Sequence, residues 1–318
     1  MPNPTAKNGA LHVRTPIVRD AEVEAALRKT VWMKMECLQP VGSFKIRGIG
    51  LLCQELKSAG CTRFVSSSGG NAGYAVAYAG RELSLPVSVV VPSTTSDATR
   101  DKIRTMGAEV RVAGDVWDEA DVEARKLALE EGAAYIPPFD HPTLWRGHST
   151  MIDEVAESHG KPDRVVVTVG GGGLLCGVLE GMHRSGWSDV PVLAVETAGA
   201  ESLHAAISAG EVVSLQEITS IATCLGARRV ASAALEWTGK HRVRSVVVSD
   251  ASAVKGCLEF ANRHRILVEP ACGAGLSLIY ENAECLSDAR RILVVVCGGI
   301  GVDFDQLNRW AAETGLRQ

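Results

Sequence analysis

A lysine lies between two apolar residues in the stretch QPVGSFKIRG, residues 39–48. The turn-forming residues before it predict that Lys45 lies in the first turn of a helix, where the helix dipole lowers the basicity of an amine. Phe44 and Ile46 indicate an apolar pocket, which lowers a lysine pKa further. Both effects favour a neutral, nucleophilic amine. The alternative is a solvated helix lysine, which is the usual environment of this residue type.

Four consecutive glycines, Gly170, Gly171, Gly172 and Gly173, follow a predicted strand and precede a predicted helix in TVGGGGLLCG. Their backbone N–H groups can converge on an anion at the N-terminus of the helix. One glycine suffices for a tight turn and four cost conformational entropy, so we interpret the stretch as an anion site. It lacks the ending of a P-loop and the spacing of a dinucleotide fingerprint, which favours a single phosphate over ATP or NAD.

Two more glycine-rich stretches follow predicted strands, at the edge where ligands bind in open α/β sheets. SSSGGNAG, residues 66–73, offers hydroxyls, backbone amides and the Asn71 side chain to a small carboxylate or a ring oxygen. Helix capping by Ser68 or Asn71 explains this stretch equally well. VCGGIGVD, residues 296–303, places Cys297 at the same edge if its strand lies in the central sheet, although most buried cysteines are structural. A nucleophilic lysine together with a cradle for one phosphate indicates pyridoxal phosphate, an aldehyde that lysine holds as a Schiff base.

Short β-branched runs alternate with helical patterns along the chain, which predicts βαβ units and mainly parallel sheets. Eight runs are predicted strands, at residues 31–36, 63–67, 87–91, 109–113, 164–169, 191–197, 245–249 and 291–296. Helical patterns lie between them, for example at residues 72–82, 118–130 and 174–184. A proline-rich break, YIPPFDHP at residues 135–142, predicts a boundary between two lobes.

The composition is that of an ordinary globular protein, and 318 residues favour two lobes over one. The net charge of −4 argues against a nucleic-acid surface. Nine scattered cysteines without a CxxC pair indicate reduced thiols rather than disulfides or a zinc site. The first residues contain no apolar signal core, and no apolar run approaches the ~18 residues of a membrane helix. We therefore expect a cytoplasmic protein.

The four stretches PVGSFKIRG, SSSGGNAG, GGGGLLCG and VEPACGAG, in this order, resemble the fold type II pyridoxal-phosphate enzymes, and among them the serine/threonine dehydratase family. The resemblance extends from about residue 12 to about residue 303. It implies an α/β protein with two open, twisted, mostly parallel lobes and the cofactor in the cleft between them. The small domain, residues 40–139, would be inserted in a large domain of residues 1–39 and 140–318. The resemblance also implies a homodimer, and the few residues after position 303 leave no room for the C-terminal regulatory domain of some threonine dehydratases.

The resemblance assigns roles to the glycine-marked residues. Lys45 would hold the cofactor and act as the acid and base at the substrate α-carbon. Phe44 would pack against the pyridine ring, Asn71 would bond its hydroxyl oxygen, and Cys297 would face its nitrogen, where many relatives carry serine. The four glycines at 170–173 would hold the phosphate. The substrate carboxylate would be bound by Ser68, Gly69, Gly70 and Asn71.

The family also carries a monovalent cation, usually potassium, near the phosphate loop. The matching ligands are the Glu196 carboxylate, the Ser202 hydroxyl and the carbonyl groups of Gly170, Ala200, Leu225 and Ala227. Without the resemblance, a surface or ion-paired carboxylate is the simpler interpretation of Glu196.

The implied reaction is β-elimination of L-serine to pyruvate and ammonia, and of L-threonine to 2-oxobutanoate. The alternatives within the fold type are a threonine dehydratase, a serine racemase and a cysteine-synthase-like β-replacement enzyme. Racemases that resemble this sequence carry a serine immediately before the Gly-Asn pair, where this chain has Gly69. A binding protein without catalysis is disfavoured because Lys45, Asn71 and the glycine loop are all retained.

Overall fold

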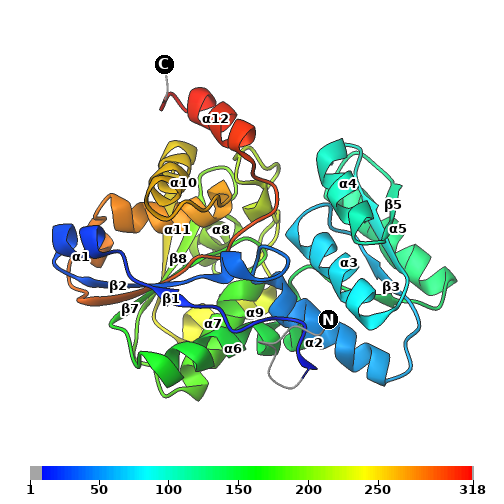
Figure 1. Ribbon diagram of the computed structural model, residues 1–318, viewed down its shortest axis with the longest axis horizontal. Helices are drawn as coiled ribbons and strands as arrows, with labels where there is room; N and C mark the ends of the chain where they lie inside the picture. The colour runs from blue at the N-terminus through cyan, green and yellow to red at the C-terminus, as the bar shows by residue number, and fades with distance from the viewer. Residues whose placement is uncertain (1–8, 317–318) are drawn as a thin grey trace. The chain divides into compact units, whose positions relative to one another are not determined.

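The computed structural model describes residues 9–316, and the chain divides into two compact units (Figure 1). The first unit comprises Gln39–His148 together with the N-terminal segment up to Arg14, of which residues 9–14 are described. The second unit comprises Thr15–Leu38 and Ser149–Gln318. The division into a small domain of residues 40–139 and a large domain of residues 1–39 and 140–318 stays a prediction.

The second unit is built on a six-stranded sheet with the strand order β1-β2-β10-β7-β8-β9. All neighbours are parallel except β1 and β2. β7 and β8 are buried along their whole length, because their runs of valine have both faces covered. The strands are β1 (Ile17–Val18), β2 (Thr30–Lys34), β7 (Arg164–Thr168), β8 (Val192–Thr197), β9 (Val243–Val248) and β10 (Arg291–Val295).

Helices of the second unit follow the strands in the βαβ manner. α7 (Gly173–Arg184) begins directly after the glycine loop, and α8 (Ser202–Ala209) follows β8. α10 packs against α11. The other helices are α1 (Ala21–Leu27), α9 (Ser232–Lys240), α10 (Asp250–His264), α11 (Pro270–Tyr280) and α12 (Phe304–Glu313), with short 3-10 turns η2 (Glu36–Leu38), η3 (Thr223–Leu225) and η4 (Glu284–Leu286).

The first unit contains a four-stranded parallel sheet with the order β5-β4-β3-β6. Its strands are β3 (Phe64–Ser66), β4 (Val87–Val91), β5 (Glu109–Val112) and β6 (Ala134–Tyr135). Its helices are α2 (Lys45–Ser58), α3 (Asn71–Leu83), α4 (Asp97–Thr105) and α5 (Trp117–Glu130). α2 packs against α3. α6 (Pro142–Ser158) contributes its first residues to this unit and the remainder to the second unit.

All eight predicted strands are present, with ends that differ by at most two residues, and the prediction of mainly parallel sheets is confirmed. β1 and β6 were not predicted, because two residues are too few to show an alternating or apolar pattern.

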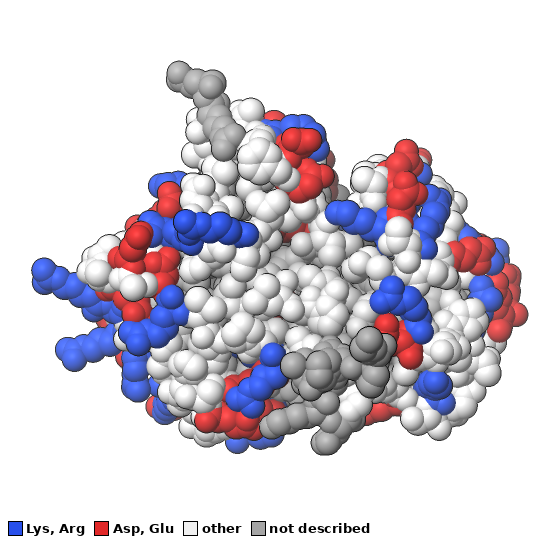
Figure 2. Space-filling model, in the orientation of Figure 1, with Lys and Arg blue, Asp and Glu red and all other residues white. Residues whose placement is uncertain are grey.

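Acidic and basic side chains are interspersed over the face of the molecule in view (Figure 2). The nine cysteines are free thiols. Within residues 9–316, no helix is both long and apolar enough to cross a bilayer.

Candidate active site

Lys45 is the first residue of α2, as predicted, and no side chain caps the helix end before it. Its amine donates a hydrogen bond to the Pro138 carbonyl oxygen at 2.5 Å. The Nζ atom lies 5.3 Å from the centre of the Phe44 ring. Lys45 and Phe44 are half-buried and Ile46 is fully buried, so the lysine is not the solvated helix residue of the alternative interpretation.

Two glycines bring the backbone of α6 against the backbone of α2, just behind Lys45. A Cβ atom at Gly48 would lie 2.5 Å from the Leu144 carbonyl oxygen and 2.6 Å from Cε1 of His148. A Cβ atom at Gly147 would lie 2.4 Å from the Arg47 carbonyl oxygen. Only glycine permits this approach. The crossing places the His148 ring edge-on to Phe44, with ring centres 4.9 Å apart. The sequence contained no signal for this contact, because it depends on how two distant helices pack.

The stretch SSSGGNAG forms the turn between β3 and α3, at the carboxyl end of β3. Gly70 occupies the N-cap position of α3, and no side chain caps the helix. Ser68 accepts a hydrogen bond from the Gly70 amide at 3.3 Å. A Cβ atom at Gly73 would lie 1.8 Å from the Ser68 carbonyl oxygen, so the turn folds tightly onto the helix. Helix capping by Ser68 or Asn71 therefore does not explain the stretch.

The four-glycine loop lies between β7 and α7, at the carboxyl end of a central strand. Gly172 has φ of +88°, and a Cβ atom there would lie 2.6 Å from Cβ of Ala234. Among the backbone hydrogen bonds of the described residues, none uses the N–H of residues 170–173 as a donor. The first N–H groups of a helix have no partner within the helix. The loop therefore presents free donors to an anion at the N-terminus of α7.

Cys297 lies two residues after β10, the neighbour of β7 in the sheet, and is buried. Its thiol lies 3.5 Å from Oγ1 of Thr168, which precedes the glycine loop. A hydrogen bond with Cys272 lowers the pKa of the Cys297 thiol, and burial opposes this change. Cys297 and the glycine loop therefore lie at the same edge of the sheet, as predicted for a shared crevice.

Glu269 is a buried carboxylate beside this edge that was not predicted as a site residue. It accepts a hydrogen bond from the Gly301 amide. A Cβ atom at Gly299 would lie 2.1 Å from its carboxyl carbon. The one sequence feature that could have indicated Glu269 as a site residue was its position inside the VEPACGAG stretch.

Glu196 lies in β8, next to β7, and is fully buried, so it is not a surface carboxylate. It accepts hydrogen bonds from the amides of Leu203 and His204, both at 2.8 Å. Burial nevertheless raises the pKa of the Glu196 carboxyl to about 7. Ser202 is also fully buried, and its hydroxyl has no hydrogen-bond partner among the described residues.

Of the other predicted cation ligands, Leu225 lies against Gly170 of the glycine loop. A Cβ atom at Gly170 would lie 3.0 Å from Cα of Leu225. The Leu225 carbonyl oxygen accepts a hydrogen bond from the Ala227 amide at 2.8 Å. Ala200 is buried, and its amide donates to the Thr197 carbonyl oxygen. Within residues 9–316 no cluster of three His, Cys, Asp or Glu side chains forms a metal site, so a cation here would be bound by the single carboxylate of Glu196 together with hydroxyl and carbonyl oxygens.

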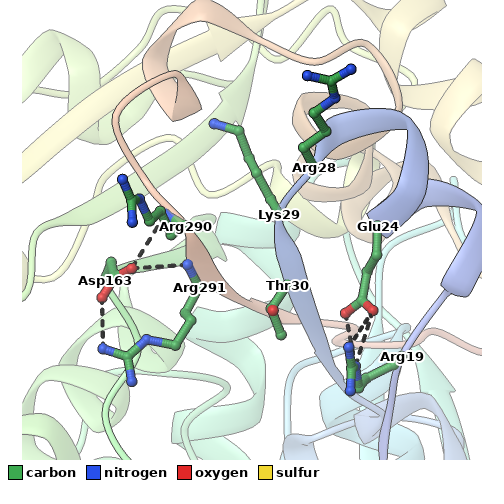
Figure 3. Close-up of a pocket in the computed structure, with 8 residues that line it drawn as sticks. All are labelled: Arg19, Glu24, Arg28, Lys29, Thr30, Asp163, Arg290 and Arg291. Carbon is green, nitrogen blue, oxygen red and sulfur yellow. Dashed lines mark hydrogen bonds and ion pairs between the residues drawn. The ribbon is translucent and has the colours of Figure 1, made fainter.

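An open pocket of about 900 Å³ lies elsewhere in the second unit, at the amino ends of β2, β7 and β10 (Figure 3). Arg19 pairs with Glu24, and Arg291 pairs with Asp163 at 3.0 Å. The glycine loop and Cys297 lie at the carboxyl ends of the strands, so this pocket is at the opposite edge of the sheet from the predicted site.

The residues fit pyridoxal phosphate on two observations from the second unit. The glycine loop supplies unpartnered N–H donors for a phosphate, and its glycines leave no side chain in the way. The free thiol of Cys297 lies at the same edge of the sheet. The first unit supplies a half-buried lysine whose amine donates a hydrogen bond to the Pro138 carbonyl oxygen.

Comparison with known proteins agrees with this fit. Residues 10–298 match a family described as pyridoxal-phosphate dependent enzyme. The human protein named L-serine dehydratase/L-threonine deaminase is 44% identical over 316 residues, which cover 96% of each chain. A Dictyostelium discoideum protein named L-serine dehydratase is 43% identical and covers 96% of this chain and 93% of its own. The crystal structure of a fungal L-serine ammonia-lyase from Rhizomucor miehei has a TM-score of 0.91 and 37% identity, covering 96% of this chain and 99% of its own. This chain belongs to the pyridoxal-phosphate dependent enzyme family.

Proposed function

We propose that this chain is a pyridoxal-phosphate-dependent L-serine ammonia-lyase, which converts L-serine to pyruvate and ammonia and L-threonine to 2-oxobutanoate. The observation that carries the proposal is 44% identity over 96% of both chains with a protein named for these two activities. Lys45 at the start of α2 and the glycine loop before α7 would supply the amine and the phosphate-binding N–H groups that the cofactor needs.

Each of these residues would have a separate role in the elimination reaction. When bound, pyridoxal phosphate draws electrons from the substrate α-carbon and makes its proton acidic. Lys45 would remove that proton, because a neutral amine near its target is an effective base. Ser68, Gly69, Gly70 and Asn71 would hold the substrate carboxylate at the start of α3. Loss of the β-hydroxyl with a proton, as water, would give an enamine, which then takes up water and yields pyruvate and ammonia.

The cofactor would be held by residues of both units. Asn71 would bond the ring hydroxyl oxygen and Phe44 would pack against the ring. The four glycines at 170–173 would donate N–H groups to the phosphate. Cys297 would face the ring nitrogen, and a thiol is a weak hydrogen-bond partner compared with a carboxylate. The nitrogen would then stay unprotonated, which suits elimination better than transamination.

A keto-acid assay tests the proposal. The purified protein, incubated with pyridoxal phosphate, should be yellow and should release pyruvate from L-serine and 2-oxobutanoate from L-threonine. Release of 2-oxobutanoate alone would support a threonine dehydratase. Formation of a new amino acid from O-acetylserine and sulfide, without pyruvate, would support a β-replacement enzyme. A colourless protein with no turnover would contradict the proposal.

Gly69 should prevent racemisation, because the reverse face of the substrate then lacks a second acid/base side chain. We expect L-serine to give pyruvate with D-serine below detection by chiral chromatography. A Cβ atom at position 69 would lie 2.5 Å from Oγ1 and 2.8 Å from Cγ2 of Thr95, so Gly69→Ser must displace Thr95 and should slow elimination. The double variant with Thr95→Ala should recover elimination and gain D-serine, while Thr95→Ala alone should form none. D-serine formed by the wild type as fast as pyruvate would refute this role of Gly69.

We propose that a potassium ion is bound by the Glu196 carboxylate, the Ser202 hydroxyl and the carbonyl groups of Gly170, Ala200, Leu225 and Ala227. Because the pKa of Glu196 is raised in the folded state, the protonated carboxyl stabilises the folded protein at low pH. This stabilisation is lost as the pH rises through about 7. A cation beside the carboxylate favours the ionised form and should offset that loss. In KCl, compared with tetramethylammonium chloride, the melting midpoint should rise by about 3 °C at pH 8 and by much less at pH 6.

The Glu196→Gln variant should remove this difference between the two salts. Equal melting midpoints of the wild type in both salts at pH 8 would argue against the cation site. A difference that is larger at pH 6 than at pH 8 would show that the ion binds elsewhere.

Three finer points are also proposed. The chain would act as a homodimer, as the family resemblance implies, and light scattering of the purified protein measures this. It would work in the reducing cytoplasm, since its nine cysteines are free and several of them are buried. Residues 40–139 would fold as a small domain inserted between residues 1–39 and 140–318, which limited proteolysis measures.

A further inference from the structure

His148 is a fully buried histidine whose two ring nitrogens have no hydrogen-bond partner among residues 9–316. Buried polar atoms are nearly always paired, because leaving them unpaired costs free energy. Burial, followed by the charges of Lys45, Arg47 and His12, holds the pKa of His148 well below its usual value. The imidazole is therefore neutral at physiological pH, with one donor and one acceptor nitrogen.

The position of His148 is fixed by backbone packing and leaves the ring little freedom to turn away. Gly48 contacts Cε1 of the ring closely, and the adjacent Gly147 seats the helix on α2. The ring lies edge-on to Phe44, 4.9 Å between centres, and Lys45 Nζ lies 5.3 Å from the same Phe44 ring. His148 and Lys45 are thus both neighbours of one aromatic ring, within the first unit.

Of the three charged or titratable groups that face His148, Lys45 is the one that must change partners during the proposed reaction. Arg47 is fully buried and donates to the Val13 carbonyl oxygen. His12 belongs to the segment before the first strand and already has a partner. The Lys45 amine is bonded to the Pro138 carbonyl oxygen, and it would have to leave that oxygen to bind the cofactor.

We propose that His148 is a positioning residue for Lys45: its acceptor nitrogen is a second hydrogen-bond acceptor for the amine, which exchanges between this nitrogen and the Pro138 carbonyl oxygen. The proposal rests on the proposed function for the role of this exchange in the reaction. A buried acceptor at a fixed place limits the orientations of a flexible lysine side chain. His148 thereby keeps the amine close to the substrate without itself touching the reacting atoms.

Two substitutions separate the polar role of the ring from its packing. His148→Phe keeps an aromatic ring against Phe44 and removes both nitrogens, whereas His148→Gln restores a hydrogen-bond acceptor. With L-serine and pyridoxal phosphate, we expect His148→Phe to lower kcat by about 10–100-fold with KM within about twofold of the wild type, because a base displaced by an ångström loses about that much rate. His148→Gln should recover most of the loss. Borohydride reduction should still attach the cofactor to Lys45 in both variants.

A second measurement tests the contact between His148 and Lys45 without following the reaction. In the cofactor-free full-length protein, the rate at which acetic anhydride modifies Lys45 is followed against pH by peptide mass spectrometry. An acceptor bonded to the ammonium form raises its pKa, so the midpoint should move to lower pH in His148→Phe and return in His148→Gln. Lys57, a lysine at the other end of the same helix, is the internal control and should not change.

Wild-type kcat and an unchanged Lys45 midpoint in His148→Phe would overturn the proposal and leave only a packing role. If His148→Phe does not melt cooperatively, His148→Met, which also lacks ring nitrogens, gives the same comparison. If the wild type does not act on L-serine, the proposed function fails, and the acetylation series still decides whether His148 binds Lys45.

Discussion

Replacement of Lys45 by alanine should remove both the visible absorbance of the lysine-bound cofactor and the release of pyruvate, with kcat reduced by about 10⁴-fold or more. The expectation follows from the place of Lys45 at the first position of α2, half-buried next to Phe44, with its amine bonded to the Pro138 carbonyl oxygen. The side chain would supply both the covalent attachment and the base, so its loss removes two contributions at once. Absorbance spectra and a pyruvate assay measure the two effects.

Lys57→Ala is the matched control, because Lys57 lies in the last turn of the same helix and donates to the Leu83 carbonyl oxygen from an exposed position. It should keep the colour and activity of the wild type. Borohydride reduction of the wild type, followed by peptide mapping, gives an independent check. Cofactor found on a peptide that lacks Lys45 would show that another lysine holds it.

Substitution of Gly73 by alanine should damage both stability and substrate binding. Its Cβ atom would lie 1.8 Å from the carbonyl oxygen of Ser68 and 3.0 Å from Cγ1 of Val89, so the backbone of the SSSGGNAG turn must move. Overpacking of this kind costs about 1–3 kcal/mol of unfolding free energy. The turn carries Ser68 and Asn71, so KM for L-serine should rise about tenfold or more. Denaturant unfolding and initial rates measure the two effects.

Gly239→Ala is the control for Gly73→Ala, since both glycines lie inside helices. No atom lies within 4 Å of a Cβ built on Gly239, and its backbone suits any residue. Alanine there should stabilise the protein by about 0.5–1 kcal/mol, because it reduces the freedom of the unfolded chain. A Gly73→Ala protein with the stability and KM of the wild type would show that the turn accommodates a methyl group at this position.

The strands were predictable from the sequence because their signal is local. β7 and β8 are runs of valine and other apolar residues that no helix pattern matches, and each is followed within two residues by a glycine. The position of Lys45 at the start of a helix was also predictable from a local signal, because four adjacent residues, Pro-Val-Gly-Ser, indicate the turn before the helix. The glycine loop and Cys297 were predicted at one edge because parallel strands end on the same side of a sheet.

Features that depend on packing between distant segments were not predictable. The unpartnered ring of His148 results from a crossing of α2 and α6 at Gly48 and Gly147, a hundred residues apart. The raised pKa of Glu196 results from burial, although its sequence reads like an ordinary strand end. Both features arise from contacts that form only on folding, so neither can be recognised in the sequence.

The strand order of the second unit has a consequence for biosynthesis. β10, one of the last elements of the chain, lies between β2 and β7 and pairs with both. At 5–20 residues per second, β2 leaves the ribosome on the order of tens of seconds before β10. During that interval β2 and β7 each present an unpaired edge, which is a template for pairing with other chains. A nascent chain of this protein should therefore bind chaperones until residue 295 has emerged, and truncations before Arg291 should aggregate.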